Sequence, residues 1–227
     1  VPAGLRVLPY AADHPTRGVR NLRVAGGRFV GDWQLGATQL PDLPLRTPGR
    51  HNLENALAAA TVAQAVGLTA AEIREGLASF RGVRRRFEYI VDRDDLAFIS
   101  DYAHHPTELT ATLAAARALY PGRRLTVLFQ PHLYSRTRDF MADFAEVLSR
   151  ADELLLLPIY AAREAPIAGV TSATLLDGVD APVKQLLDPE EVVDYLSAHP
   201  PQVLLLLGAG DVDGLIAPLR RALDASP

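Results

Sequence analysis

The sequence has no cysteine among its 227 residues, and this absence removes several kinds of protein from consideration. Disulfide bonds, thiolate zinc sites and iron–sulfur clusters all need cysteine. The net charge of −4 and the isoelectric point near 5.9 give no general attraction to nucleic acid or to an anionic membrane. The longest apolar runs, ELLLLPI and VLLLLGAG, have the length of a strand and are too short to cross a bilayer. With no signal-peptide pattern, the sequence predicts a cytoplasmic protein that binds neither nucleic acid nor a membrane.

The first part of the chain differs in pattern from the rest. VRNLRVAGGRFVGDW predicts two strands joined at Gly26-Gly27, and the prolines at 41, 44 and 48 are expected to keep the following chain extended. NLENALAAATVAQAVG then predicts a helix, with Asn52 as its candidate N-cap and Gly67 as its stop. TAAEIREGLASF predicts a second helix, because its Thr and Glu have the spacing of a capping box.

From Phe87 onward, strand-like and helix-like segments alternate. FEYIVD and LAFISD flank Asp94-Asp95 and are expected to pair antiparallel. Further strands are predicted at 125–129, 154–159, 183–187 and 203–207, and helices near 106–119, 136–149, 172–177, 189–198 and 212–223. The helix near 189 is expected to start with Asp188 as its cap. This alternation predicts an α/β fold: a Rossmann-like, mostly parallel sheet with one antiparallel edge strand.

Polar side chains follow several of the predicted strands. They are Asp101, Tyr102, His104 and His105 after LAFIS, Gln130, His132, Tyr134, Ser135 and Arg136 after LTVLF, and Tyr160 after ELLLLPI, while VLLLL ends in Gly208 and Gly210. In an open α/β sheet, ligands bind beyond the carboxyl ends of the strands. We therefore expect one composite site at that edge.

Several of these residues also have a plainer explanation. His105 precedes Pro106 and could cap the helix that begins there, and His132 could be a capping or packing residue. Adjacent residues in extended chain point to opposite sides, so the two neighbouring histidines are a poor pair of metal ligands. A cation at a helix start opposes the helix dipole, so Arg136 favours a bound anion, whereas Arg138 reads as a surface residue.

Two further patterns leave alternatives open. GAGDVDG is one residue longer than the dinucleotide-binding fingerprint and follows the last strand, so it supports a tight turn better than an NAD-dependent oxidoreductase. Asn52 and Asn55 lie three residues apart on one side of a predicted helix. Their amides suit the edge of an adenine ring, although helix capping also explains Asn52.

Six strings occur in the order in which the ATP-dependent Mur ligases of peptidoglycan synthesis have them. They are GRHNLENALAA, GVRRRFE, DYAHHPTE, FQPHLYSRTRDF, EAPIAGVTS and GAGD, and the resemblance covers nearly everything from Thr47 to the end. The family has a domain for the UDP-sugar, a central ATP domain with a GxxGKT loop, and a C-terminal Rossmann-like domain. The chain is expected to be a fragment: residues 1–81 would be the last part of the central ATP-binding domain, and 82–227 the C-terminal ligase domain.

The resemblance implies a reaction as well as a fold. The sugar's carboxylate would take the γ-phosphate of ATP, with Mg²⁺ held mainly by residues outside this chain, and an amine would attack the acyl phosphate. The strings favour the family member that joins L-alanine to UDP-N-acetylmuramate. A related murein-peptide ligase, or a non-catalytic module that binds a nucleotide or an amino acid, remains an alternative. The fragment alone is expected to be inactive.

The resemblance also assigns residues. It places His51, Asn52 and Asn55 near the adenine and Asp101 at the ribose. It places Arg86 and His104 at the nucleotide and γ-phosphate, as catalytic residues. Around the incoming L-alanine it places Tyr102, His132 and Arg136. It assigns no metal ligand in these residues. Leu133 stands where the family often has a second Arg, which leaves Arg136 as the main carboxylate anchor, and Ser100 stands where a second Asp is frequent.

Overall fold

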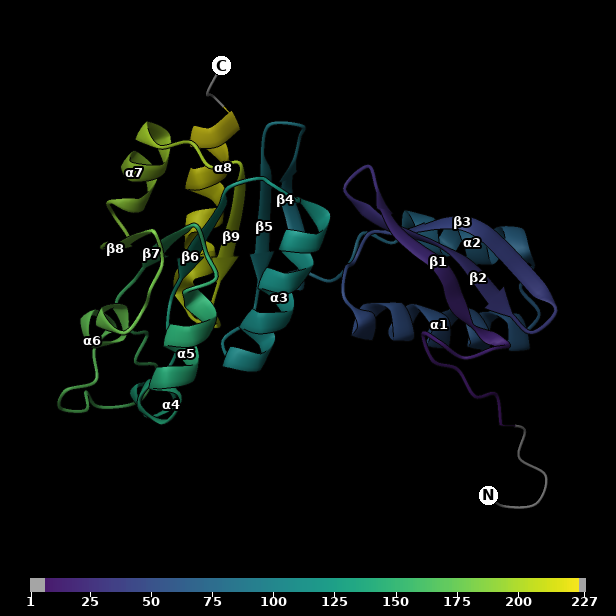
Figure 1. Cartoon of the computed structure of the whole chain (residues 1–227), viewed down its shortest axis with the longest axis horizontal. Coiled ribbons are helices and arrows are strands. Elements are labelled where there is room, and N and C mark those ends of the chain that lie inside the picture. Colours follow the sequence, from purple (N-terminus) through teal and green to yellow (C-terminus); the bar gives the residue numbers. More distant parts are fainter. Residues whose placement is uncertain (1–6, 225–227) are drawn as a thin grey trace. The chain divides into compact units, whose positions relative to one another are not determined.

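A computed structural model describes residues 7–224 (Figure 1). Its contacts divide the chain into two compact units, Val1–Gly82 and Val83–Pro227. The assignment of the first 81 residues to a central ATP-binding domain, and of the rest to a C-terminal ligase domain, stays a prediction.

The first unit is a three-stranded antiparallel sheet with two helices. Strands β1 (Arg17–Ala25), β2 (Arg28–Leu35) and β3 (Thr38–Leu45) lie in that order, followed by α1 (Arg50–Ala65) and α2 (Ala70–Ser79). Gly26 and Gly27 both have positive φ, 57° and 68°, which is the backbone that a two-residue hairpin turn requires, so the predicted hairpin is confirmed. Trp33 and leucines of the sheet pack against Leu57 and Ile73 of the helices, and this apolar cluster is the core of the unit.

The sequence predicted only extended chain after the first hairpin, whereas the structure has a third strand, β3, at that place. The strand contains Pro41 and Pro44 and pairs with β2 alone, so it is an edge strand. Proline lacks an N–H group and is tolerated in a sheet mainly at an edge, where one side of the strand needs no donor.

The helix starts show one wrong prediction and one correct one. Helix α1 begins at Arg50 with Gly49 as its N-cap, so Asn52 is not the cap. The Asn52 amide lies in the first turn and donates to the carbonyl of Pro48 at 2.7 Å. Helix α2 has the predicted capping box: Thr69 accepts from the backbone N–H of Glu72, and the Glu72 carboxylate accepts from that of Thr69 at 2.7 Å.

The second unit is a six-stranded sheet in the order β4-β5-β9-β6-β7-β8. The strands are β4 (Glu88–Asp92), β5 (Ala97–Asp101), β6 (Leu125–Phe129), β7 (Glu153–Leu156), β8 (Val183–Leu186) and β9 (Val203–Leu207). Only the β4–β5 pair is antiparallel, and β4 lies at the edge. The predicted Rossmann-like sheet with one antiparallel edge strand is therefore confirmed.

Helices cover both faces of this sheet (Figure 1). They are α3 (Pro106–Leu119), α4 (Tyr134–Asp139), α5 (Met141–Leu148), α6 (Ser172–Asp177), α7 (Val192–Ala198) and α8 (Ile216–Asp224), with a 3₁₀ turn, η1 (Asp211–Leu215), before α8. Leu128 and Leu155 face the apolar side chains of α7 and α8, whereas Phe129 packs against Phe144 of α5 with ring centroids 5.6 Å apart. Successive residues of a strand point to opposite faces, which explains why the central strands are apolar throughout.

Three predicted helices have different boundaries. The segment near 136–149 is two helices, α4 and α5, because the backbone leaves helical geometry at Phe140. The segment from 189 is helical only from Val192, with Glu191 as its N-cap, so the predicted cap Asp188 is wrong; its N–H donates to the Glu191 carboxylate at 2.9 Å. The last helix begins as the 3₁₀ turn η1. None of the helices between residues 7 and 224 has the length and apolar character that a membrane span requires.

A buried polar group links three elements at the amino end of β7. Glu153 is 2% exposed, and its carboxylate accepts from the Thr126 hydroxyl at 2.7 Å and from the Tyr195 hydroxyl at 2.8 Å. Burial, followed by the hydrogen bond to Glu153, raises the pKa of Tyr195 to about 12. The phenol therefore stabilises the fold in its neutral form.

We expect Tyr195→Phe to lower the free energy of unfolding by about 1–3 kcal/mol, because it removes a donor from a buried carboxylate. The folded pKa lies above the unfolded value, so this stabilisation is complete below pH 10 and is lost as the pH rises towards 12. Urea unfolding should therefore show that the difference in the free energy of unfolding between the wild type and the variant becomes smaller from pH 10 upwards. Tyr10→Phe, at an exposed site, is the control; equal stability of Tyr195→Phe and wild type would contradict the expectation.

Candidate functional site

Four ring side chains form a row at the carboxyl edge of the large sheet. Tyr102 and His104 follow β5, while His132 and Tyr160 follow β6 and β7 and extend that parallel pairing by one bridge. Neighbouring ring centroids are 5.3 Å apart for Tyr102–His104, 6.0 Å for His104–His132 and 5.5 Å for His132–Tyr160. The structure thus brings together the polar residues that the sequence places after separate strands. We call these four residues the ring row.

Two arginines lie at the Tyr102 end of the ring row. The guanidinium carbons of Arg85 and Arg86 are 4.8 Å and 5.8 Å from the centre of the Tyr102 ring. Arg86, the predicted nucleotide residue, is exposed. The Arg85 side chain is only 15% exposed; it donates to the carbonyls of Gly208 and Gly210 and pairs with Asp213 at 3.4 Å. Sequence reasoning did not single out Arg85, and its only signal was the run of arginines in GVRRRFE.

Both oxygens of the Asp101 carboxylate accept hydrogen bonds from backbone N–H groups. One oxygen accepts from the N–H of Phe87 at 2.9 Å and the other from that of Ala103 at 2.8 Å. Burial raises the pKa of Asp101, while the two backbone donors and Arg86 oppose that rise. Asp101 therefore fastens the connector before β4 to the end of β5. Its role at a ribose stays a prediction, since each carboxylate oxygen can accept a further hydrogen bond.

The two adjacent histidines have different surroundings. The His104 ring lies between Tyr102 and His132, and its Nδ1 is 2.8 Å from the Tyr102 carbonyl oxygen. His105 is the N-cap of α3, and its ring packs on Phe140 with centroids 4.5 Å apart. The explanation of His105 as a helix cap is confirmed. His104 alone belongs to the ring row.

Arg136 lies beside His132, and it belongs to the last turn of the six-residue helix α4, so the prediction that it stands at a helix start is wrong. Its Nη1 is 3.3 Å from Nδ1 of His132. Burial, then the charge of Arg136 and that of His104, lower the pKa of the His132 imidazole. No ion pair to Arg136 is found within residues 7–224, whereas Arg138 is exposed and pairs with Asp139 at 2.7 Å, as a surface residue would.

Glu164 holds the start of α4 and was not singled out from the sequence, although it belongs to the string EAPIAGVTS. Its carboxylate accepts from the backbone N–H of Ser135 at 2.9 Å and from the Ser135 hydroxyl at 2.5 Å. The Ser135 hydroxyl, followed by the backbone donors, lowers the pKa of Glu164. A charged carboxylate at this position stabilises the helix start next to Arg136.

The GAGD segment is a tight turn packed against the ring row. A Cβ atom at Gly210 would lie 2.5 Å from Oε1 of Gln130 and 2.7 Å from Cγ of Tyr160, so only glycine fits there. Gln130 in turn accepts from the N–H of Val212 at 3.2 Å and donates to Asp211 at 2.9 Å. These contacts explain the glycine without a dinucleotide.

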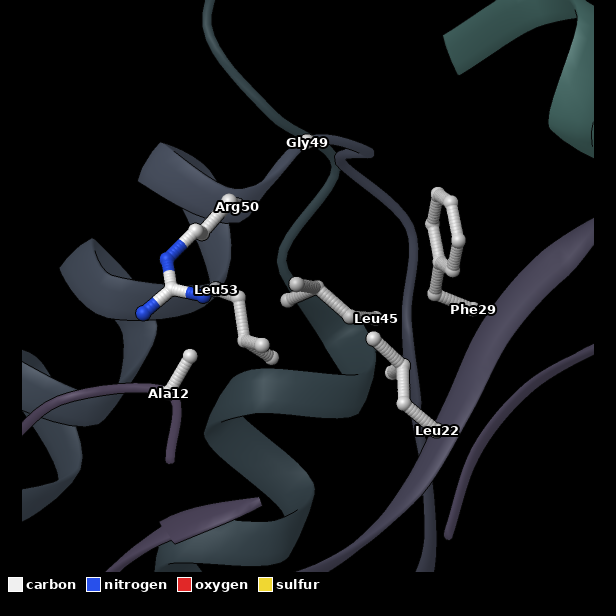
Figure 2. Close-up of a pocket in the computed structure, with 7 residues that line it drawn as sticks. All are labelled: Ala12, Leu22, Phe29, Leu45, Gly49, Arg50 and Leu53. Atoms are coloured by element: carbon white, nitrogen blue, oxygen red, sulfur yellow. The ribbon is translucent and has the colours of Figure 1, made fainter. Parts of the chain in front are cut away.

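The three residues predicted near adenine lie on α1 in the first unit. His51 and Asn55 are exposed, and the His51 ring lies over Gly49, where an added Cβ would come within 2.9 Å of it. A pocket of about 190 Å³ opens beside the start of α1 and is lined by Ala12, Leu22, Phe29, Leu45, Gly49, Arg50 and Leu53 (Figure 2). This lining does not include His51, Asn52 or Asn55, so their role at an adenine stays a prediction.

The described part of the chain, residues 7–224, contains no group of three or more His, Cys, Asp or Glu side chains that could hold a metal ion. The expectation that Mg²⁺ is bound mainly by other residues is therefore not tested by this structure.

A mostly parallel α/β sheet with helices on both faces, and with aromatic, imidazole and guanidinium groups at its carboxyl edge, defines a domain of the Rossmann-like class. The family model described as "Mur ligase, glutamate ligase domain" matches residues 85–210, more than half of the chain. The chain belongs to the Mur ligase family. The resemblance drawn from its sequence strings is thereby confirmed.

Individual relatives agree with this family. The UDP-N-acetylmuramate–L-alanine ligase of Porphyromonas gingivalis is 45% identical over 204 residues, which are 89% of this chain and 45% of that protein. That of Phocaeicola vulgatus is 43% identical over 214 residues, 94% of this chain and 47% of that protein. The crystal structure of UDP-N-acetylmuramate-alanine ligase from Thermotoga maritima shares the fold, with a TM-score of 0.75 at 24% identity over 95% of this chain and 47% of that one. The chain spans about half the length of the curated relatives it matches.

We expect Arg136→Gln to raise the pKa of His132, because the guanidinium charge disfavours the imidazolium form. Burial is the larger cause of the lowering, so the pKa should stay below its ordinary value in the variant. The measurement is an NMR pH titration of the His132 ring protons. Arg138→Gln, two residues away and paired with Asp139, should leave the titration unchanged; an unchanged His132 pKa in Arg136→Gln would show that the guanidinium does not act on the ring.

Proposed function

We propose that this chain is the C-terminal half of an ATP-dependent ligase that joins L-alanine to UDP-N-acetylmuramate in peptidoglycan synthesis. The observation on which the proposal rests is Arg136, a partly buried guanidinium that contacts a neutral ring of the ring row and forms no ion pair within residues 7–224. A guanidinium binds a carboxylate through two parallel hydrogen bonds. Arg136, with His132 and Tyr102, therefore suits the carboxylate end of an amino acid.

The other end of the ring row suits a nucleotide. Arg86 is exposed beside Tyr102, and His104 is the next ring. Positive charge and hydrogen-bond donors are the groups that hold polyphosphates. We propose that Arg86 binds the phosphates, that His104 lies near the γ-phosphate, and that Asp101 contacts the ribose. In the first unit, which we take as the last part of the central ATP-binding domain, we propose that His51, Asn52 and Asn55 contact the adenine.

The proposed reaction has two steps. ATP, with Mg²⁺, supplies the phosphoryl group that turns the sugar's carboxylate into an acyl phosphate. Arg136 then orients L-alanine, and the alanine amine attacks the acyl carbon through a tetrahedral intermediate. Holding the nucleophile in the correct direction contributes much of the rate in such a step.

The proposal is tested by completing the chain with the amino-terminal half of the Porphyromonas gingivalis relative. The completed protein should release ADP in a reaction that needs both UDP-N-acetylmuramate and L-alanine, and the 227-residue chain alone should release none. Release that depends on a tripeptide in place of L-alanine would favour a murein-peptide ligase. Nucleotide or alanine binding without turnover would favour a binding module.

Arg136→Lys in the completed ligase should raise the KM for L-alanine and lower kcat, with the KM for ATP near normal. Lysine keeps the charge and loses the two parallel hydrogen bonds, and misplacing a nucleophile by about 1 Å can cost on the order of a hundredfold. Steady-state kinetics with each substrate varied is the measurement. Wild-type alanine kinetics in Arg136→Lys would show that the alanine carboxylate binds elsewhere.

A further inference from the structure

The partners of His104 determine which of its ring nitrogens is protonated. Nδ1 is 2.8 Å from the carbonyl oxygen of Tyr102 and 3.3 Å from a carboxylate oxygen of Glu108. A carbonyl oxygen can only accept a hydrogen bond, so Nδ1 must carry a proton. In the neutral imidazole, Nε2 is then unprotonated and is a hydrogen-bond or proton acceptor.

Glu108 holds this arrangement from the first turn of α3. The carboxylate oxygen that faces Nδ1 also accepts from the backbone N–H of His104 at 2.9 Å and from that of His105 at 3.2 Å. The backbone and the ring of His104 are therefore fastened to the same atom, which restricts the rotation of the ring.

The partner of His132 imposes the opposite tautomer. Nδ1 of His132 is 3.3 Å from Nη1 of Arg136, and a guanidinium has only donors. Nδ1 must accept, so in the neutral ring the proton lies on Nε2. The charge of Arg136 and the partial burial of the ring also favour this neutral state.

The two rings are neighbours and face few other charges. Their centroids are 6.0 Å apart at an interplanar angle of 67°. His132 stacks on Tyr160 at 21°, and His104 meets Tyr102 edge to face. The charged groups that act on the pair include Glu108, Arg136 and Glu164.

We propose that His104 and His132 are held in opposite neutral tautomers, with Glu108 and Arg136 as their positioning residues. Nε2 of His104 then accepts a proton, and the Nε2–H of His132 donates a hydrogen bond. Such a pair fits a ligand that offers an N–H donor next to an oxygen acceptor, which is the chemistry of an amine attacking an activated carboxyl group.

This inference rests on the proposed function for its chemical step. The amine nitrogen forms a bond to the acyl carbon, and the bond from that carbon to the phosphate oxygen breaks. The phosphate leaves with the electron pair, and one N–H proton of the amine passes to Nε2 of His104. The Nε2–H of His132 hydrogen-bonds to the oxygen that becomes negative in the tetrahedral intermediate. General base catalysis of this kind contributes about 10²–10⁴-fold.

The tautomers can be measured in the 227-residue chain itself, without substrates. Two-bond ¹H–¹⁵N correlation spectra at about pH 8.5, where an ordinary histidine is neutral, distinguish the two tautomers. His104 should give the Nδ1–H pattern and His132 the Nε2–H pattern, each assigned by its loss in a single histidine variant. His105 and His14 are internal references for Nε2–H, because their Nδ1 atoms accept from backbone N–H groups. An Nε2–H pattern for His104, or an Nδ1–H pattern for His132, would overturn the proposal.

The proton-acceptor role of His104 can be separated from a role at the γ-phosphate in the completed ligase. Hydroxylamine is a neutral nucleophile near pH 7 and traps an acyl phosphate as a hydroxamate. His104→Gln should lose about a hundredfold or more of alanine addition and much less of the hydroxamate yield. Glu108→Gln should show the same split to a smaller extent. Glu146 lies on α5 and pairs with Arg150, and Glu146→Gln should show no such split.

The outcomes separate the two proposals. Equal losses of hydroxamate and alanine product in His104→Gln would place His104 at the phosphorylation step and refute its role as proton acceptor. A completed wild-type protein that makes neither product would refute the proposed function and the chemical step together. The tautomer spectra would then still decide whether the rings are held as we propose.

Discussion

The Tyr102 end of the site depends on the buried carboxylate of Asp101. A carboxylate with 9% exposure is costly to bury unless hydrogen bonds satisfy it, and here two backbone N–H groups do so. One of them belongs to Phe87, so the connector before β4 is held against the end of β5. The N–H of Tyr102 also donates to the carbonyl of Arg85 at 2.8 Å. The positions of Arg85, Tyr102 and His104 all follow from this attachment, since the Tyr102 carbonyl orients the His104 ring.

Carboxylates around the site act mainly on the scaffold. Asp213 pairs with Arg85, Glu108 binds the backbone before α3, and Glu164 binds Ser135 at the start of α4. Arg136 differs, because it contacts an imidazole nitrogen and forms no ion pair within residues 7–224. This distribution leaves the positive charge of Arg136 beside an imidazole rather than a carboxylate, which is a suitable environment for an anionic ligand.

Packing at the turn after β9 closes the same edge. Gly210 approaches Gln130 and Tyr160 so closely that a side chain would displace one of them. The polar atoms of Gln130 are in turn bound by Val212 and Asp211 of η1. The end of the ring row that contains Tyr160 therefore depends on backbone geometry at a position with no side chain of its own. A sequence pattern shows such a glycine, but the reason for it lies in residues that are 50 and 80 positions away.

The sequence by itself determined the α/β class, the antiparallel hairpins, the capping of α2 and α3, and the gathering of polar residues after the strands. Each of these follows from local periodicity, from capping chemistry or from the rule that parallel strands end at one edge. It also showed that His104 and His105 point to different sides. Only the tertiary structure decided that β3 forms a strand, that α1 begins before Asn52, and that Phe140 divides α4 from α5. It also decided which atoms face each histidine ring: the Tyr102 carbonyl and Glu108 for His104, and Arg136 for His132. Those contacts join different secondary-structure elements, and local sequence patterns do not encode distances between elements.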